Sequence, residues 1–217
     1  MVIDLSPPTL PQAAAPFRVL VVSDRSTARG PAVHRLLGAH LRAGGGHADV
    51  VLGCAGVAAA AGDPMHPDTA RALAELDVAA GGHAARRLTE RRVVQADLVL
   101  TVARAQMRAV TELRPDAAGR TFPLLELARL AAAAEGGATP VGHTGSIRAR
   151  VTALDALRAL PSRAGAAGDR DDVDDPADGG YAGHRRMVRA VDVVTLQVAR
   201  LLTLSAAAGR TAAAPAV

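Results

Sequence analysis

The sequence of 217 residues contains no lysine, no asparagine and no tryptophan, and its single cysteine is Cys54. All 25 basic side chains are therefore arginines, so no step can use a lysine amine as a Schiff base or nucleophile. One cysteine excludes an intrachain disulfide, a Cys-x-x-Cys redox pair and a cysteine-rich zinc site. Lysine and asparagine have AT-rich codons, so their absence is typical of a GC-rich genome.

Aromatic residues and long apolar runs are also scarce. One tyrosine, two phenylalanines and a net charge of only +4 argue against nucleic-acid binding, which needs a basic face and stacking platforms. No apolar run reaches the roughly 18 residues of a membrane span, and the N-terminus lacks the basic and apolar regions of a signal peptide. These absences predict a soluble cytoplasmic protein with neither a nucleic-acid nor a membrane partner.

What is present is an alternation of apolar runs of strand length with amphipathic segments of helical spacing. Strands are expected at 17–22, 48–53, 96–102 and 121–124. Helices are expected from Pro31 onward and at 67–76, 104–113, 125–134, 147–160 and 181–204. Residues 54–66 are expected to form a loop, and 81–92 are a polar stretch. This order predicts an α/β domain with a mainly parallel sheet.

A polar loop between the first strand and the first helix is the candidate ligand site. Its eight residues are Ser23, Asp24, Arg25, Ser26, Thr27, Ala28, Arg29 and Gly30. Ligands of parallel sheets bind beyond the carboxyl ends of the strands, and a helix N-terminus favours an anion. Arg29 can add a bidentate fork, and the hydroxyl groups can donate. The alternative is an ordinary polar loop whose Ser or Thr caps the helix.

Several segments together resemble the low-molecular-weight protein tyrosine phosphatases. VLVVSDRSTARGPAVHRLL is similar to the opening of that family, whose phosphate loop reads C-T-G-N-x-C-R-S-P. The family's S-A-G-T segment is resembled by GCAGVAAAAGDPMHPDTARALAEL, and its G-H-x-A-R-x-L segment by GGHAARRLTERRVVQADLVLTV. The segment that follows in the family is resembled by RTFPLLELARL. The family's D-x-x-D-P loop and last helix are resembled by DDVDDPADGGYAGHRRMVRAV. The match covers most of 17–135 and 170–204, in order.

The resemblance implies a three-layer α/β fold around a mainly parallel four-stranded sheet. A single domain is then expected over 17–205, enlarged at 136–168, between a flexible arm at 1–16 and a flexible tail at 206–217. The resemblance implies neither a metal nor a cofactor. The expected ligand is a phosphate-like anion, carried by a phosphorylated protein or an anionic small molecule, and the oligomeric state is not predicted.

At the position of the family's nucleophilic cysteine the chain has Ser23. A thiol ionises near ~8.5, whereas a hydroxyl lies far higher, near the ~15.7 of water, so the loop cannot hold Ser23 as an alkoxide. A serine nucleophile needs a general base at hydrogen-bond distance. His34 is expected to be a helix-surface residue that points away from the loop. Cys54 stands where the family's supporting serine is, and is expected to be buried rather than reactive.

Other loop positions depart from the family pattern as well. The family's loop glycine, asparagine, second cysteine and Ser/Thr after the arginine are Arg25, Ser26, Ala28 and Gly30 here, whereas Arg29 and Pro31 match. In the acidic segment Asp175, before Pro176, matches the general acid, Asp172 matches the earlier aspartate, and Ala177 replaces an aromatic residue. Without the resemblance, this segment reads as a solvated acidic turn.

Three functional hypotheses follow. The first is a pseudophosphatase that binds an anion at 23–30 without thiol chemistry. The second is a repurposed enzyme that uses Ser23, Arg29 and Asp175 on an anionic or phosphorylated small molecule. The third is an active tyrosine phosphatase in which the catalytic cysteine was exchanged for serine. Because the only tyrosine is Tyr181, after the acidic segment, poor binding of aryl phosphates is expected. Arsenate reduction through several thiols is excluded by the cysteine count.

Overall fold

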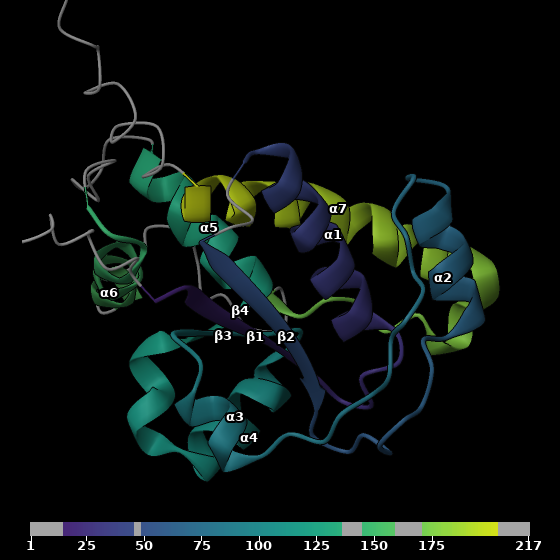
Figure 1. Cartoon of the computed structure of the whole chain (residues 1–217), viewed down its shortest axis with the longest axis horizontal. Coiled ribbons are helices and arrows are strands. Elements are labelled where there is room, and N and C mark those ends of the chain that lie inside the picture. The colour runs from purple at the N-terminus through teal and green to yellow at the C-terminus, as the bar shows by residue number, and fades with distance from the viewer. Residues whose placement is uncertain (1–14, 46–48, 136–144, 159–170, 204–217) are drawn as a thin grey trace, which may run out of the picture.

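The computed structural model describes residues 15–45, 49–135, 145–158 and 171–203. Its centre is a four-stranded sheet in the order β2-β1-β3-β4, in which every neighbouring pair is parallel (Figure 1). The strands are β1 (Phe17–Ser23), β2 (Val50–Gly56), β3 (Leu98–Thr101) and β4 (Thr121–Pro123). The predicted α/β class and parallel sheet are confirmed.

The two central strands are apolar along their length because both of their faces are covered. Successive residues of a strand point to opposite faces, so Val21 enters the larger core cluster and Val22 the smaller one, and both are fully buried. The same division separates Leu98 and Leu100 from Val99 in β3.

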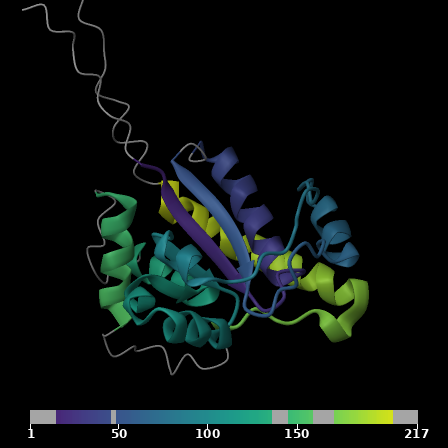
Figure 2. The same ribbon diagram turned by 60° about the horizontal axis from the view of Figure 1, so that its bottom comes forward.

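Helices cover the sheet on both sides and make it the middle of three layers (Figure 1). One side carries α1 (Arg29–Ala43), α2 (Pro67–Ala74), α5 (Leu124–Glu135) and α7 (Gly180–Thr203), and the other carries α3 (Glu90–Val94) and α4 (Arg104–Leu113). The long helix α7 packs against α1, α2 and α5. Figure 2 shows α6 (Ile147–Arg158) at the end of the molecule opposite α2. No helix in the described ranges is long and apolar enough to cross a membrane.

The clearest differences from the expected boundaries are at β2 and α3. The second strand runs to Gly56 rather than Gly53, because β2 pairs with β1 along its whole length, up to Ser23 opposite Gly56. The end of the polar stretch at 81–92 starts a short helix, α3, which was not predicted. The helix is capped by the Thr89 hydroxyl, which accepts the N–H of Arg92. The tail at 206–217, most of the arm at 1–16 and much of the enlarged segment at 136–168 lie outside the described residues.

Candidate functional site

The loop after β1 forms the floor of a cavity of about 340 Å³ at the carboxyl ends of the strands. The residues that line the cavity are Ser23, Asp24, Arg25, Ser26, Thr27, Ala28, Arg29, His66, Asp175, Pro176, Ala177 and His184. The structure thus brings together every predicted site residue except Gly30, which is buried and does not line the cavity.

The loop backbone leaves its N–H groups free and uses its carbonyl groups for support. The carbonyls of Ser23, Asp24 and Thr27 accept N–H groups of the following segment, at 2.8–3.0 Å. Within the described residues, no N–H of 24–28 donates to another backbone group. These donors precede the N-terminus of α1, so the loop offers the arrangement that binds anions in other proteins.

Ser26 adopts a left-handed conformation, with φ of 58°, that turns the loop. Its Oγ lies 3.3 Å from Cys54 Sγ, and its carbonyl accepts a hydrogen bond from His83 Nε2 at 2.7 Å. A Cβ on Gly56 would lie 2.5 Å from the carbonyl oxygen of Asp24, so only glycine lets the end of β2 approach this closely. These contacts hold the loop in a defined conformation, although Arg25 stands where the family has a glycine.

Cys54 lies beneath the loop, and burial raises the pKa of its thiol to about 11. The bond to Ser26 and the charge of Arg35 favour the thiolate but do not offset the burial. A thiol that keeps its proton is a poor nucleophile. This agrees with the expectation that Cys54 is not reactive.

Ser23 is 3 % exposed, and its Oγ has no hydrogen-bond partner within the described residues. The hydroxyl points toward Gly30 at the start of α1, where an added Cβ would collide with it. No general base among the described residues is therefore in contact with this oxygen. His34 does not line the cavity, as expected. It was expected at the helix surface, but it is half-buried against β2, and burial lowers the pKa of its imidazole.

Arg29 and Asp175 both line the cavity and form an ion pair with each other. Arg29 Nη2 lies 2.7 Å from Asp175 Oδ2, and Nη1 donates to the carbonyl of Val173 at 3.2 Å. The Arg29 side chain is 14 % exposed and that of Asp175 57 %, so the acid is the solvated partner. An anion that binds to this guanidinium must compete with the carboxylate of Asp175.

The acidic segment is anchored to α4, to α5 and to the residue after β3 rather than solvated throughout. Asp171 is buried and forms ion pairs with Arg104, at 2.5 Å, and with Arg129, at 3.5 Å. Asp172 Oδ1 accepts the N–H of Arg104, and the N–H of Val173 donates to the carbonyl of Val102, the residue after β3. These contacts hold Asp175 over the loop.

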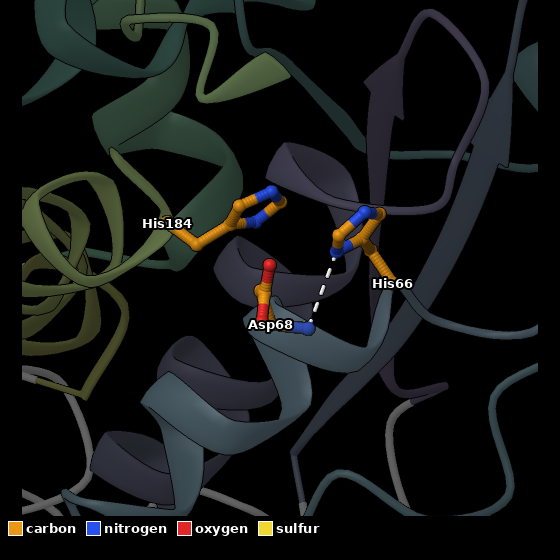
Figure 3. A group of neighbouring side chains, drawn as sticks. All are labelled: His66, Asp68 and His184. Atoms are coloured by element: carbon orange, nitrogen blue, oxygen red, sulfur yellow. Dashed lines mark hydrogen bonds between the residues drawn. The ribbon is translucent and has the colours of Figure 1, made fainter. Parts of the chain in front are cut away.

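Two histidines in the cavity wall were missed by the sequence analysis (Figure 3). His66 caps α2, and its Nδ1 accepts the N–H of Asp68 at 3.2 Å. His184, in the first turns of α7, is buried, and its Nδ1 lies 2.7 Å from the hydroxyl of Thr69. The two rings are stacked, with centroids 4.2 Å apart. Because Pro67 predicted the start of a helix, the sequence indicated that His66 precedes a helix. No local sequence pattern indicated that His66 and His184 lie together.

No phenyl or phenol ring lines the cavity. The hydroxyl of Tyr181 donates to Glu75, and the guanidinium of Arg71 stacks on the Tyr181 ring at 4.0 Å. Ala177 is exposed where the family has an aromatic residue. The cavity therefore lacks an aromatic wall other than its two imidazoles.

Comparison with known proteins agrees with this architecture. A family model described as "Low molecular weight phosphotyrosine protein phosphatase" matches residues 18–136, more than half of the chain. No curated protein sequence matches the chain.

Solved structures of similar fold include three that bear on the site. A Cys-to-Ser mutant of YwlE arginine phosphatase, with a phosphorylated active-site serine, is 20 % identical; the match covers 86 % of this chain and 95 % of that one, with a TM-score of 0.62. A low molecular weight tyrosine phosphatase from T. tengcongensis is 21 % identical, covering 84 % and 97 %, with a TM-score of 0.60. Wzb of Vibrio vulnificus, in complex with benzylphosphonate, is 19 % identical, covering 85 % and 97 %, with a TM-score of 0.58.

Proposed function

Because the chain belongs to the family of low molecular weight phosphotyrosine protein phosphatases, we propose that it binds a phosphate-like anion at residues 23–30 without thiol-based hydrolysis. The observation that carries this proposal is the state of Ser23. Its hydroxyl is buried, has no hydrogen-bonded base in the described part of the chain, and points toward Gly30. The only thiol of the chain, on Cys54, is held protonated beneath the loop.

Anion binding is supported by the donors that remain. The N–H groups of 24–28 and the start of α1 supply partial positive charge, and Arg29 supplies a full one. Benzylphosphonate is bound by the Vibrio vulnificus relative, and the same kind of oxyanion is the ligand proposed here. When the ligand binds, one of its oxygens replaces the carboxylate of Asp175 as the partner of the Arg29 guanidinium.

The sharpest test compares binding and turnover in the same samples. Inorganic phosphate titrated by calorimetry should bind to the wild type and lose at least tenfold in affinity in Arg29→Ala, because a charge-assisted hydrogen bond contributes roughly 1.5–3 kcal/mol. Arg42→Ala, an exposed arginine at the other end of α1, is the matched control and should bind as the wild type does. Absence of phosphate binding by the wild type would refute the proposal.

Turnover of an aryl phosphate by the wild type and by Ser23→Cys completes the test. We expect no turnover by the wild type. Strong wild-type activity contradicts the proposal, and full activity of Ser23→Cys alone supports instead a tyrosine phosphatase that has lost only its nucleophile. Inactivity of both proteins agrees with a site that has diverged further, at Gly30 and Ala177.

A second candidate is an enzyme that uses Ser23 on a phosphorylated small molecule. It is favoured by Asp175, which is kept over the loop and lines the same cavity as Ser23. The serine of the YwlE mutant carries a phosphoryl group, and the same modification of Ser23 would require its hydroxyl to rotate away from Gly30. Intact-mass measurement after incubation with acetyl phosphate distinguishes the candidates: a stable phosphoryl adduct absent from Ser23→Ala favours the enzyme.

A further inference from the structure

The cavity extends well beyond the phosphate loop. Its volume of about 340 Å³ exceeds what a tetrahedral oxyanion fills, since a water molecule takes about 30 Å³ of the liquid. The remaining wall is made by His66, His184 and the turn at 175–177. A ligand that is bound through its phosphate therefore places its next group against the two imidazoles.

The hydrogen bonds of the two rings engage the Nδ1 atom of each imidazole. A neutral imidazole has one N–H donor and one acceptor nitrogen. Nδ1 of His66 accepts the N–H of Asp68, so the proton of the neutral ring is on Nε2. Nδ1 of His184 is engaged by Thr69. Figure 3 shows the second nitrogens of both rings on the same side, away from the N–H of Asp68.

We propose that His66 and His184 form a subsite for a second anionic group, so that the ligand is a small aliphatic phosphate ester that also carries a carboxylate or a further phosphate. This inference rests on the proposed binding of a phosphate by the loop. Nε2–H of His66 donates to the second oxyanion, and His184 donates when protonated. The ester is aliphatic because Ala177 and Pro176, and no phenyl ring, complete the wall.

The charged side chains that line the cavity balance, because Arg25 and Arg29 are matched in number by Asp24 and Asp175. Arg29 is already matched by Asp175, and the exposed Arg25 has only a loose pair with Asp24, at 3.9 Å. The loop N–H groups and the imidazoles are the donors left for added negative charge. A single phosphate uses the first set and leaves the second unused.

A metal ion is the competing occupant of this pair. His66, Asp68 and His184 each offer one ligand atom within 4.8 Å of the others. Nδ1 of His66 is occupied by the N–H of Asp68 and Nε2 carries the proton, so the neutral ring has no free lone pair for a metal. The face-to-face stacking, at 13° between the planes, also favours two parallel donors over a shared centre.

Binding of the second anion should be linked to proton uptake. His184 is faced by His66 and Asp68 of α2 and by Asp175. Its pKa is lowered by burial first and then by His66, against the raising effect of the two carboxylates. The imidazole is therefore neutral in the free protein at neutral pH. A ligand carboxylate stabilises the imidazolium, so the affinity gained from that carboxylate grows as the pH falls toward the lowered pKa of His184.

Matched ligand pairs test the subsite by calorimetry with the full chain. Phosphoglycolate is compared with ethyl phosphate, and 3-(phosphonooxy)propanoate with propyl phosphate, so that each pair differs in one carboxylate. We expect at least one carboxylate ligand to bind about tenfold more tightly than its partner at about pH 5.5, and the ratio to shrink at about pH 8. The phosphate pKa of each ligand is measured separately, because the carboxylate raises the second pKa of the phosphate beside it, and the ratio is corrected for this titration.

The variants His66→Gln and His184→Gln should reduce this ratio toward one, whereas His40→Gln, on α1 and paired with Asp192, should leave it unchanged. His66 is exposed, so its variant keeps the test valid if loss of the buried His184 unfolds the protein. Equal binding within both pairs, with phosphate still bound, overturns the subsite alone. Loss of all phosphate binding overturns the proposed function. Stoichiometric Zn²⁺ binding that requires His66 and Asp68 replaces the anion subsite with a metal site.

Discussion

The Oγ atom of Ser23 occupies the space in which a Cβ atom would stand on Gly30. The two departures from the family pattern at these positions are therefore physically coupled. A serine that turns toward α1 requires a residue without a side chain at the helix start, and Cys54 Sγ, 3.2 Å from the same point, closes the remaining space.

Gly30→Ala should destabilise the protein. Overpacking of a filled site costs about 1–3 kcal/mol, and urea denaturation measures it. Ser23→Ala should be nearly neutral, and the double variant should be more stable than the sum of the two changes predicts, because the colliding hydroxyl is absent. Strict additivity would show that the side chains do not meet.

Asp175→Asn should strengthen anion binding, because the carboxylate competes for the guanidinium of Arg29. The acid is largely exposed, so the gain is modest, about two- to fivefold in the dissociation constant of inorganic phosphate. Asp174→Asn removes a neighbouring exposed charge that does not line the cavity and serves as the control. Weaker binding by Asp175→Asn would mean that the carboxylate positions Arg29 rather than blocks it.

Cys54 should react slowly with thiol reagents in the native protein. With a pKa of about 11 against about 8.5 in the unfolded chain, the thiolate at pH 8 is on the order of 100-fold less abundant. The rate of reaction with a disulfide reagent, native against urea-unfolded, measures this directly. Because the chain has no other cysteine, Cys54→Ser supplies a blank.

The same thiol makes stability depend on alkaline pH. The folded state keeps a proton that the unfolded state releases near pH 8.5, so the stabilisation is full below about 8.5. It is lost progressively as the pH rises toward about 11. The free energy of unfolding of Cys54→Ser should fall less steeply over this window. Parallel pH profiles would contradict the assignment.

Asp171→Asn should loosen the acidic segment. Removal of one partner from a buried pair costs 3–5 kcal/mol, but Arg104 and Arg129 are partly exposed, so we expect roughly 1–3 kcal/mol. Chemical denaturation of this variant beside Asp155→Asn, whose ion pair with Arg158 is more exposed, gives the comparison. An equal effect of both changes would show that the buried pair has no special role.

Much of the fold was predictable because its helices and strands follow from local sequence patterns. The strand β1 and the helix α4 follow from runs of apolar residues and their spacing, and α4 ends at Leu113 before the Arg-Pro pair, as predicted. The position of the loop at 23–30 follows from the rule that ligands lie beyond parallel strands. The short helix α3 was not predicted because a segment of about one turn is too short to show the helical spacing of apolar residues.

The rest of the site could not be predicted because it depends on contacts between distant segments. His66 and His184 come from different helices, and only the packing of α2 on α7 stacks them. The direction of the Ser23 hydroxyl depends on space at Gly30, which composition does not show. The acidic segment read as a solvated turn when taken alone, whereas Asp171 is buried between two arginines.

Asp175 and His184 belong to one stretch of chain that runs directly into α7. His184 lies in α7, which packs along α1, α2 and α5, so this wall cannot shift without tilting a helix of 24 residues. The other wall is held by the ion pair of Asp175 with Arg29 and by the contacts of Asp171 and Asp172 with Arg104. Such a cavity is preorganised: a ligand of the right length finds its two walls already spaced, and one that is too long meets a rigid limit.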